Sequence, residues 1–264
     1  MATEPDKQSF WDHLDALRAA ILKSLLAAVA FGLAAFCLKE EMFDIILAPK
    51  EEDFITYRLL YSLSGSVTEA EAPHFLVKLI NTGLAEQFII HMQVALCVGA
   101  MCASPYILYQ LFRFVSPALY TDERTYAVRL VGGGYVMFLI GVLASYFLVF
   151  PLTFRFLGTY QVSSEVENMI ALQSYIATLM TMSLAMGLVF EIPILSFLFA
   201  KAGFLSAGLM RKFRRHAIVI ILIVAAVITP TSDIFTLSLV ALPMWILYEA
   251  SILIVAGVET RKAH

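Results

Sequence analysis

The stretch SPYILYQLFRFVSPALYTDER, residues 104–124, decides how this chain is organised. It begins inside an apolar run, leaves that run through aromatic residues, breaks at Pro117 and ends on a charged Asp-Glu-Arg turn. Long apolar runs lie on both sides of it. Because each of these runs is long enough to cross a bilayer, we expect residues 115–125 to form a structured loop between two membrane spans.

The composition points to a membrane protein. The 264 residues are 60% hydrophobic and 15% charged, with a mean hydropathy of +0.82. A soluble domain is nearer half apolar and a quarter charged, so the surplus must lie in lipid. A span needs about 20 apolar residues, and the length therefore allows about six spans joined by short loops.

The cysteines and the amino terminus predict neither disulfide bonds nor a cleavable signal peptide. The three cysteines, Cys37, Cys97 and Cys102, lie in apolar runs, and an odd number in such places argues against a disulfide framework. The first 18 residues are polar and no small-residue cleavage site follows the first apolar run, so we expect no cleavable signal.

The chain is predicted to be one all-α, polytopic transmembrane domain, residues 1–264, with six spans. The spans are expected at 19–38, 87–114, 126–150, 173–199, 217–228 and 234–258. The segments outside them are 1–18, 39–84, 115–125, 151–172 and 201–215.

The residues before the first two spans predict further local structure. Phe10, Leu14, Leu17 and Ile21 recur at helical spacing, which predicts a short amphipathic helix lying on the membrane surface before the first span. The acidic segment 39–84 contains FITYRLLYSLSG, which fits either a small strand or a folded-back piece. Gly83 and Glu86 indicate a helix start, since a carboxylate in the first turn favours the N-terminal dipole.

Glycine and proline mark the later spans. The third span opens with three glycines, at 132–134, where helices could pack closely, and is expected to stop at Pro151. The fifth run, residues 217–228, would give only about 18 Å of helix against a hydrocarbon core of about 30 Å. The sixth run is interrupted by Pro243 and Glu249.

The distribution of lysine and arginine predicts the orientation. With six spans both termini share one side, and that side holds thirteen basic residues against five on the other: Lys7, Arg18, Lys23, Arg113, Arg124, Arg129, Lys201, Arg211, Lys212, Arg214, Arg215, Arg261 and Lys262 against Lys39, Lys50, Arg58, Lys78 and Arg155. The positive-inside rule therefore places both termini in the cytoplasm, which makes 115–125 and 201–215 cytoplasmic loops and 39–84 and 151–172 outer loops.

No catalytic constellation appears in the sequence. There is no phosphate-binding G-x-x-x-x-G-K-[ST] loop and no G-x-S-x-G nucleophile motif. The five histidines are scattered without metal-ligand spacing. We therefore expect no catalytic residues, no metal and no cofactor.

Two carboxylates have both a structural and a functional interpretation. The turn with Glu123 could be merely solvated, or it could receive a cationic ligand on an otherwise basic face, for which arginine is the natural partner. Glu191 lies within a span, where a carboxylate is costly and usually faces the bundle interior. It could be protonated or hydrogen-bonded to Gln93 or Gln110, and it could serve the Pro193 kink or transport itself.

The central stretch resembles the TatC family, the receptor subunit of the twin-arginine protein translocase. The shared pattern is S-P-x-x-L-Y-Q-x-x-x-F-x-x-P-A-L-Y-x-x-E-R, and it is long and mixed in composition. Further matching motifs are H-L-x-x-L-R at 13–18, A-P at 48–49, F-P-L-x-F at 150–154, F-E-x-P at 190–193, T-P-x-x-D at 229–233 and A-L-P-x-x-x-L-Y-E at 241–249.

The resemblance implies six helices in a concave, glove-like bundle in the bacterial inner membrane, without ATP use. It implies binding of twin-arginine signal peptides of folded precursor proteins, transport driven by the proton-motive force, association with single-span TatA- and TatB-type subunits, and self-association. The lipid bilayer is the surrounding partner, and no nucleic acid is implied. The signal-peptide residues would be Asp12, Asp15, Leu17, Arg18, Phe114, Pro117, Leu119, Tyr120, Glu123 and Arg124. Pro49, Glu86 and Asp233 would be structural residues of the outer face.

One position departs from the family pattern. The family commonly has H-L-x-E-L-R at the N-terminus, and the matching glutamate is Ala16 here. Asp12 is four residues from Ala16 and shares its helix face, whereas Asp15 points about 100° away. Asp12 is therefore the better-placed substitute for the missing acid.

A second class of function, small-molecule transport, is also compatible with a polytopic membrane protein. A proton-coupled small-molecule transporter could use Glu191 as its proton site. Such transporters commonly show paired broken helices from internal repeats, and no internal repeat is visible in this chain.

Overall fold

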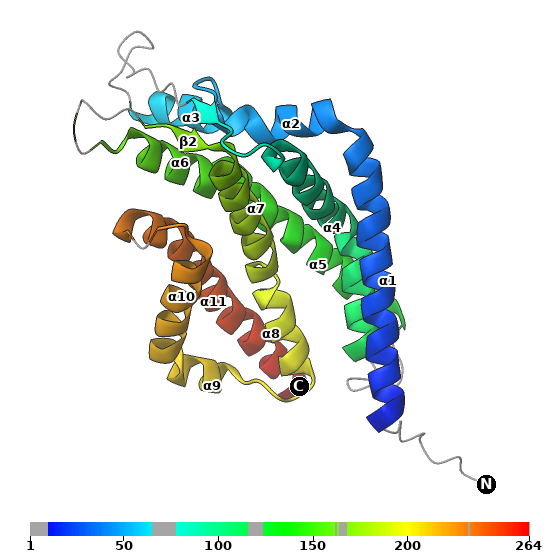
Figure 1. The fold of residues 1–264 in the computed structure, drawn as a ribbon. Coiled ribbons are helices and arrows are strands. Elements are labelled where there is room, and N and C mark those ends of the chain that lie inside the picture. The colour runs from blue at the N-terminus through cyan, green and yellow to red at the C-terminus, as the bar shows by residue number, and fades with distance from the viewer. Residues whose placement is uncertain are drawn as a thin grey trace. The chain divides into compact units, whose positions relative to one another are not determined.

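The computed structural model describes residues 10–64, 78–115, 124–161, 163, 168–231 and 233–263. Its helices are α1 (Phe10–Cys37), α2 (Lys39–Leu47), the 3₁₀ turn η1 (Ala48–Lys50), α3 (Ile55–Ser64), α4 (Glu86–Val115), α5 (Arg124–Ala144), the π-turn η3 (Ser145–Val149), α6 (Phe150–Thr159), α7 (Leu172–Val189), α8 (Ile192–Lys201), α9 (Ala207–Lys212), α10 (Arg214–Ile228) and α11 (Ile234–Ala263), shown in Figure 1. The chain groups into two compact units. Unit 1 is Met1–Cys37 with Ala95–Tyr135, and unit 2 is Leu38–Val94 with Val136–His264.

Most of the predicted spans are long apolar helices. Within the described residues, five segments are long and apolar enough to cross a membrane: Leu14–Cys37, Glu86–Phe114, Leu130–Thr159, Leu172–Lys201 and Ile234–Thr260. The predicted fifth span is α10, which has 15 residues and is therefore only about 22 Å long. It is too short to count among the five.

The amino-terminal helix is continuous. α1 runs without a break from Phe10 to Cys37, so residues 10–18 extend the helix of the first span. The expectation of a separate surface helix is wrong for these residues. Residues 10–31 contain neither proline nor glycine, so nothing in the sequence would end a helix between the expected surface helix and the first span.

The helix of the third span continues beyond Pro151. It was expected to stop at Pro151, but α5 continues through η3 into α6 and ends at Thr159. Proline has no N–H to donate to the carbonyl four residues earlier, which is that of Phe147. The hydroxyl of Thr56 donates a hydrogen bond to this Phe147 carbonyl instead. Residues 151–159 are therefore helix rather than outer loop.

The segment beginning at Phe54 is a helix. It forms α3, so the alternative of a strand was wrong. The strand structure among the described residues is a two-residue parallel pair in which Leu79 lies opposite Ile170. The buried Phe54 ring stacks on Phe147 with centroids 5.8 Å apart, and this packing favours the folded-back arrangement.

Unit 2 is held together by aromatic and helix–helix packing. The fully buried rings of Phe150 and Tyr175 meet edge to face with centroids 5.1 Å apart. Figure 1 shows α11 beside α8 and α10, and contacts between these helices confirm the packing. Gly141 and Gly187 make the close approaches between α5 and α7, since a Cβ on Gly141 would lie 2.5 Å from the Met186 carbonyl oxygen.

Within the glycine run at 132–134, the first glycine makes no close helix contact, because a Cβ built on Gly132 would meet nothing within 4 Å. The expected close packing is therefore not found at Gly132, whereas Gly134 is buried. The tight contact in unit 1 lies elsewhere, at Gly32 and Gly99.

Candidate functional site

Small residues bring α1 and α4 together within unit 1. A Cβ added to Gly99 would lie 2.3 Å from the backbone nitrogen of Gly32 and 2.7 Å from the carbonyl oxygen of Ala28. Ala28, Ala95 and Ala103 are buried beside this crossing. Residues spaced by four share a helix face, so Ala95, Gly99 and Ala103 form a small-residue face that lets the two backbones approach.

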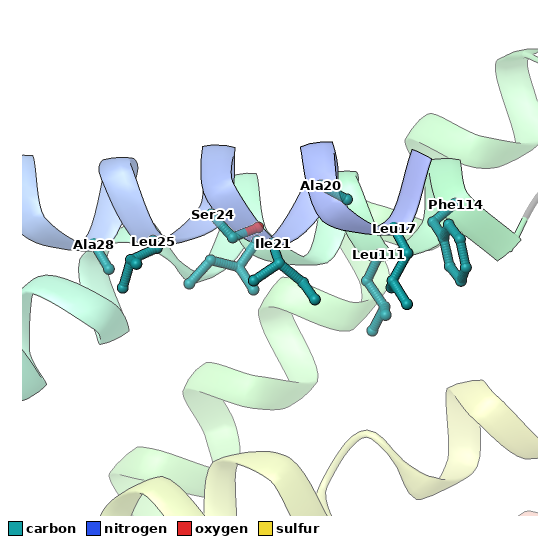
Figure 2. A pocket seen from close by; sticks show the side chains of 9 residues that line it. Leu17, Ala20, Ile21, Ser24, Leu25, Ala28, Leu111 and Phe114 are labelled. Atoms are coloured by element: carbon teal, nitrogen blue, oxygen red, sulfur yellow. The ribbon is translucent and has the colours of Figure 1, made fainter. Parts of the chain in front are cut away.

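Away from the crossing, the same two helices enclose an apolar groove of about 400 Å³. The helices run antiparallel, because Gly32 lies opposite Gly99 whereas Leu17 lies near Phe114. Figure 2 shows Leu17, Leu111 and Phe114 near one end of the groove and Ala28 near the other. The lining residues are Leu17, Ala20, Ile21, Ser24, Leu25, Ala28, Ile107, Leu111 and Phe114. Ser24 is the one polar residue among them, so the groove suits an apolar chain.

The structure brings together two of the predicted signal-peptide residues, Leu17 and Phe114, which line this groove. Asp15 and Arg18 are exposed on α1. Asp12 lies in α1 and Arg124 begins α5, but the side chains of both lie outside the description. Pro117, Leu119, Tyr120 and Glu123 fall outside the described residues.

Glu191 is the buried carboxylate of unit 2. It lies between α7 and α8, two residues before Pro193, and only 5% of its surface is exposed. Neither carboxylate oxygen has a hydrogen-bond partner among the described residues. Of the alternatives raised from the sequence, a hydrogen bond to Gln93 is therefore not formed. Gln93 instead accepts a long hydrogen bond of 3.5 Å from Gln173, and Gln110 is buried.

The backbone carbonyl of Pro49 is hydrogen-bonded to the side chain of Tyr57 in unit 2. The Tyr57 hydroxyl is 3.0 Å from the Pro49 carbonyl oxygen and 3.0 Å from that of Pro151, so its single O–H is shared between these two acceptors. Burial raises the pKa of this phenol above its ordinary value, although the nearby Arg155 opposes the shift. Tyr57 therefore stays a donor and ties η1 to α6.

The two other predicted outer-face residues cap helices. The Oε2 atom of Glu86 accepts a hydrogen bond from the backbone N–H of Gly83 at 2.7 Å and one from Thr82 at 3.1 Å. These bonds confirm the predicted helix start. An Oδ1 atom of Asp233 accepts from the backbone N–H of Thr236 at 2.8 Å, which caps α11.

Opposing effects set the acidity of Asp233. Burial acts to raise the pKa of its carboxyl, but hydrogen bonds from Thr231, Thr236 and the backbone together outweigh burial and lower the pKa. The charged form is the one that caps the helix, so Asp233 is an ionised cap at neutral pH.

Sequence reasoning missed several of these residues. Gly99 carried a readable signal, since Ala95, Gly99 and Ala103 recur every four residues. Tyr57 carried none, because its two carbonyl acceptors are distant in the sequence. The ion pair between Arg214 and Glu249, 2.7 Å apart, joins α10 to α11, and nothing in the sequence paired these two residues.

Comparison with known proteins gives these features a context. The family model described as "Sec-independent protein translocase protein (TatC)" matches residues 12–243. A Sec-independent protein translocase protein TatC from Blattabacterium sp. subsp. Periplaneta americana (strain BPLAN) is 33% identical over 99% of this chain and 100% of its own length. One from Desulforapulum autotrophicum is 34% identical over 96% of this chain and 86% of its own length.

A solved structure agrees with the fold. The crystal structure of a twin-arginine translocase receptor, TatC, superposes with a TM-score of 0.75 at 31% identity. The match covers 94% of this chain and 99% of that one.

An all-α chain with several long apolar helices and this likeness is a multi-spanning membrane protein with a role in protein transport. The chain belongs to the TatC family of Sec-independent protein translocase proteins. This membership separates it from the small-molecule transporters considered as an alternative.

Proposed function

We propose that this chain is the receptor subunit of a twin-arginine translocase and binds the signal peptides of folded precursor proteins. The observation that carries the proposal is the family match across residues 12–243, joined to the likeness to a structure titled as the twin-arginine translocase receptor. The chain acts by binding rather than by catalysis.

The recognition chemistry starts from Glu123 in the central loop. A carboxylate accepts two parallel hydrogen bonds from an arginine guanidinium, whereas a lysine ammonium is a point charge. A site built on a fixed carboxylate therefore prefers arginine to lysine at equal charge. Asp12 supplies the second acid, because Ala16 stands where the family commonly has glutamate.

The apolar groove of unit 1 extends this site. Export signals place a positive segment before 7–15 apolar residues. Phe114 lies nine residues before Glu123 in the sequence (123 − 114) and lines the groove end that also holds Leu17. The groove is lined almost entirely by apolar side chains. We infer that it receives apolar residues that follow the signal arginines.

The chain is proposed to lie in a membrane and to act together with partner subunits. The family resemblance supports a bacterial inner membrane. The excess of lysine and arginine on one side supports cytoplasmic termini. The chain nucleates a complex with single-span TatA- and TatB-type subunits and further copies of itself, and the proton-motive force drives transport. Glu191 serves transport or partner docking rather than first recognition.

Co-purification tests the function. The detergent-solubilised chain is mixed with a tagged signal peptide carrying Arg-Arg and, separately, with the same peptide carrying Lys-Lys. We expect the chain to be retained by the first peptide and not by the second. Equal retention by both peptides, or by neither, would show that the chain is not a twin-arginine receptor.

A further inference from the structure

A short helix at the end of the fourth span presents a rigid surface outside the proposed signal-peptide site. The span Leu172–Lys201 ends at a turn where Gly203 has φ +85°. The Phe204 N–H donates to the Phe199 carbonyl oxygen at 2.9 Å, and the Gly203 N–H donates to that of Ala200 at 3.1 Å. These two bonds close a Schellman motif, in which glycine adopts the left-handed conformation most easily.

The helix that follows, α9, is fixed against α11. The backbone N–H of Ala207 donates to Oε1 of Glu259 at 3.0 Å. The hydroxyl of Tyr248 donates to the Met210 carbonyl oxygen at 2.8 Å. Ala207 and Met210 are buried in one apolar cluster with Ile252 of α11. α9 thus packs against α11 through Ala207 and Met210, and these contacts hold the helix in a defined position.

Exposed apolar and basic side chains lie on α9 and on the residues directly before and after it. Phe204 is 73% exposed, and Leu209 and Phe213 are 44% and 45% exposed. Exposed basic residues accompany them along α9 and the first turn of α10. We call the set Phe204, Leu209, Arg211, Lys212, Phe213 and Arg215 the basic–aromatic surface.

The charges of this surface are not neutralised within the described part of the chain. Arg214 pairs with Glu249 at 2.7 Å, and Glu259 is bonded to α9 as described above. Arg211, Lys212 and Arg215 form no ion pair with a described residue. Three positive charges therefore remain in the same short segment as two exposed phenylalanines, directly after a membrane span.

We propose that the basic–aromatic surface binds the anionic headgroups of the membrane's own phospholipids, with the phenylalanines inserted at the headgroup boundary. Basic residues beside exposed aromatic and aliphatic side chains are the pattern of an interfacial lipid-binding element. Arginine matches a phosphate in bidentate fashion. A cationic signal peptide would be repelled here, which makes the surface distinct from the proposed receptor site.

The test measures lipid selectivity of the full chain. The chain is reconstituted in nanodiscs containing equal parts phosphatidylglycerol and phosphatidylcholine, gently extracted, and the lipids that stay bound are counted by native mass spectrometry. Each basic residue near an anionic surface changes binding by about fivefold. The triple variant Arg211→Gln, Lys212→Gln, Arg215→Gln should therefore lower the phosphatidylglycerol preference by roughly tenfold or more.

A matched control removes the same charge elsewhere. Lys39, Arg58 and Lys78 are also exposed, and replacing all three by glutamine should leave the preference unchanged. The charge-preserving variant Arg211→Lys, Arg215→Lys should retain most of it. Circular dichroism and the melting temperature show whether each variant is folded. If the triple variant misfolds, Lys212→Gln alone should lower the preference by about fivefold.

Three results would overturn the proposal. One is an unchanged phosphatidylglycerol preference in the folded triple or single variant. A second is an equal loss in the control triple, which would indicate a general effect of net charge. Loss of a co-purified acidic protein without loss of bound phosphatidylglycerol would likewise reject lipid as the occupant.

Discussion

The crossing of α1 and α4 predicts a sharp difference among three glycines of unit 1. In Gly99→Ala the new Cβ would lie 2.3 Å from the Gly32 nitrogen, whereas ordinary van der Waals contact begins at 3.4 Å. The shortfall, 3.4 − 2.3, is 1.1 Å. The opposing atoms are backbone, so they cannot rotate away and the helices must separate.

The cost follows from that separation. A radial gap of about 0.5–1 Å forfeits a quarter to a half of the dispersion energy of each contacting pair. Overpacking of this kind typically costs about 1–3 kcal/mol, against a gain of about 1 kcal/mol from replacing a helical glycine by alanine. We expect Gly99→Ala to be less stable than the parent by up to about 2 kcal/mol. Gly32→Ala meets its neighbours only at 3.4 Å, so the gain from replacing a helical glycine should leave it at least as stable as the parent.

The assay is thermal unfolding of the purified chain in detergent, with Gly132→Ala as the matched control because its Cβ meets nothing within 4 Å. The melting temperature of Gly99→Ala should fall by several degrees below that of Gly132→Ala. If the two variants melt together, the close crossing does not hold unit 1, and the reasoning from backbone contact is refuted.

Three further changes test other residues. Asp12→Ala should lower export and Ala16→Glu should restore part of it; a silent Asp12→Ala beside a defective Asp15→Ala would contradict the helix-face argument. For the Asp233 cap, the folded pKa is lowered, so its stabilising effect is complete above the unfolded value of about 4 and is lost as pH falls through the folded pKa. The melting temperature of the parent should therefore exceed that of Asp233→Asn at pH 7, and the difference should shrink below about pH 4; a constant difference would reject the ionised cap. Glu191→Gln should transport nearly normally and Glu191→Ala should fail with peptide binding intact; full transport by the alanine variant would make Glu191 only structural.

The sequence predicted the long helices because apolar runs leave few alternatives in a membrane. It failed where a single distant contact decides the outcome. Pro151 normally ends a helix, but Thr56 donates to the carbonyl that the proline leaves without its helical donor. No local pattern contains that information. The same holds for Phe54, whose stacking partner Phe147 is far along the chain.

The candidate site was predictable to a different extent. The acids at 12 and 123 were proposed from motif and charge and stay predictions, whereas the caps at Glu86 and Asp233 follow known helix-end chemistry. The groove was not found, because it depends on where α1 and α4 separate. That separation is governed by Gly32 and Gly99, whose spacing is visible in the sequence but whose mutual register is not.

The most direct test of the receptor proposal is a double-mutant cycle between Glu123 and the signal arginines. The affinity of the purified chain is measured for an Arg-Arg peptide and a Lys-Lys peptide, each with the parent and with Glu123→Gln. A charge-assisted hydrogen bond contributes about 1.5–3 kcal/mol, so the parent should prefer the Arg-Arg peptide by roughly tenfold or more, and the variant should lose most of that preference. An equal preference in parent and variant would show that Glu123 does not read the arginines.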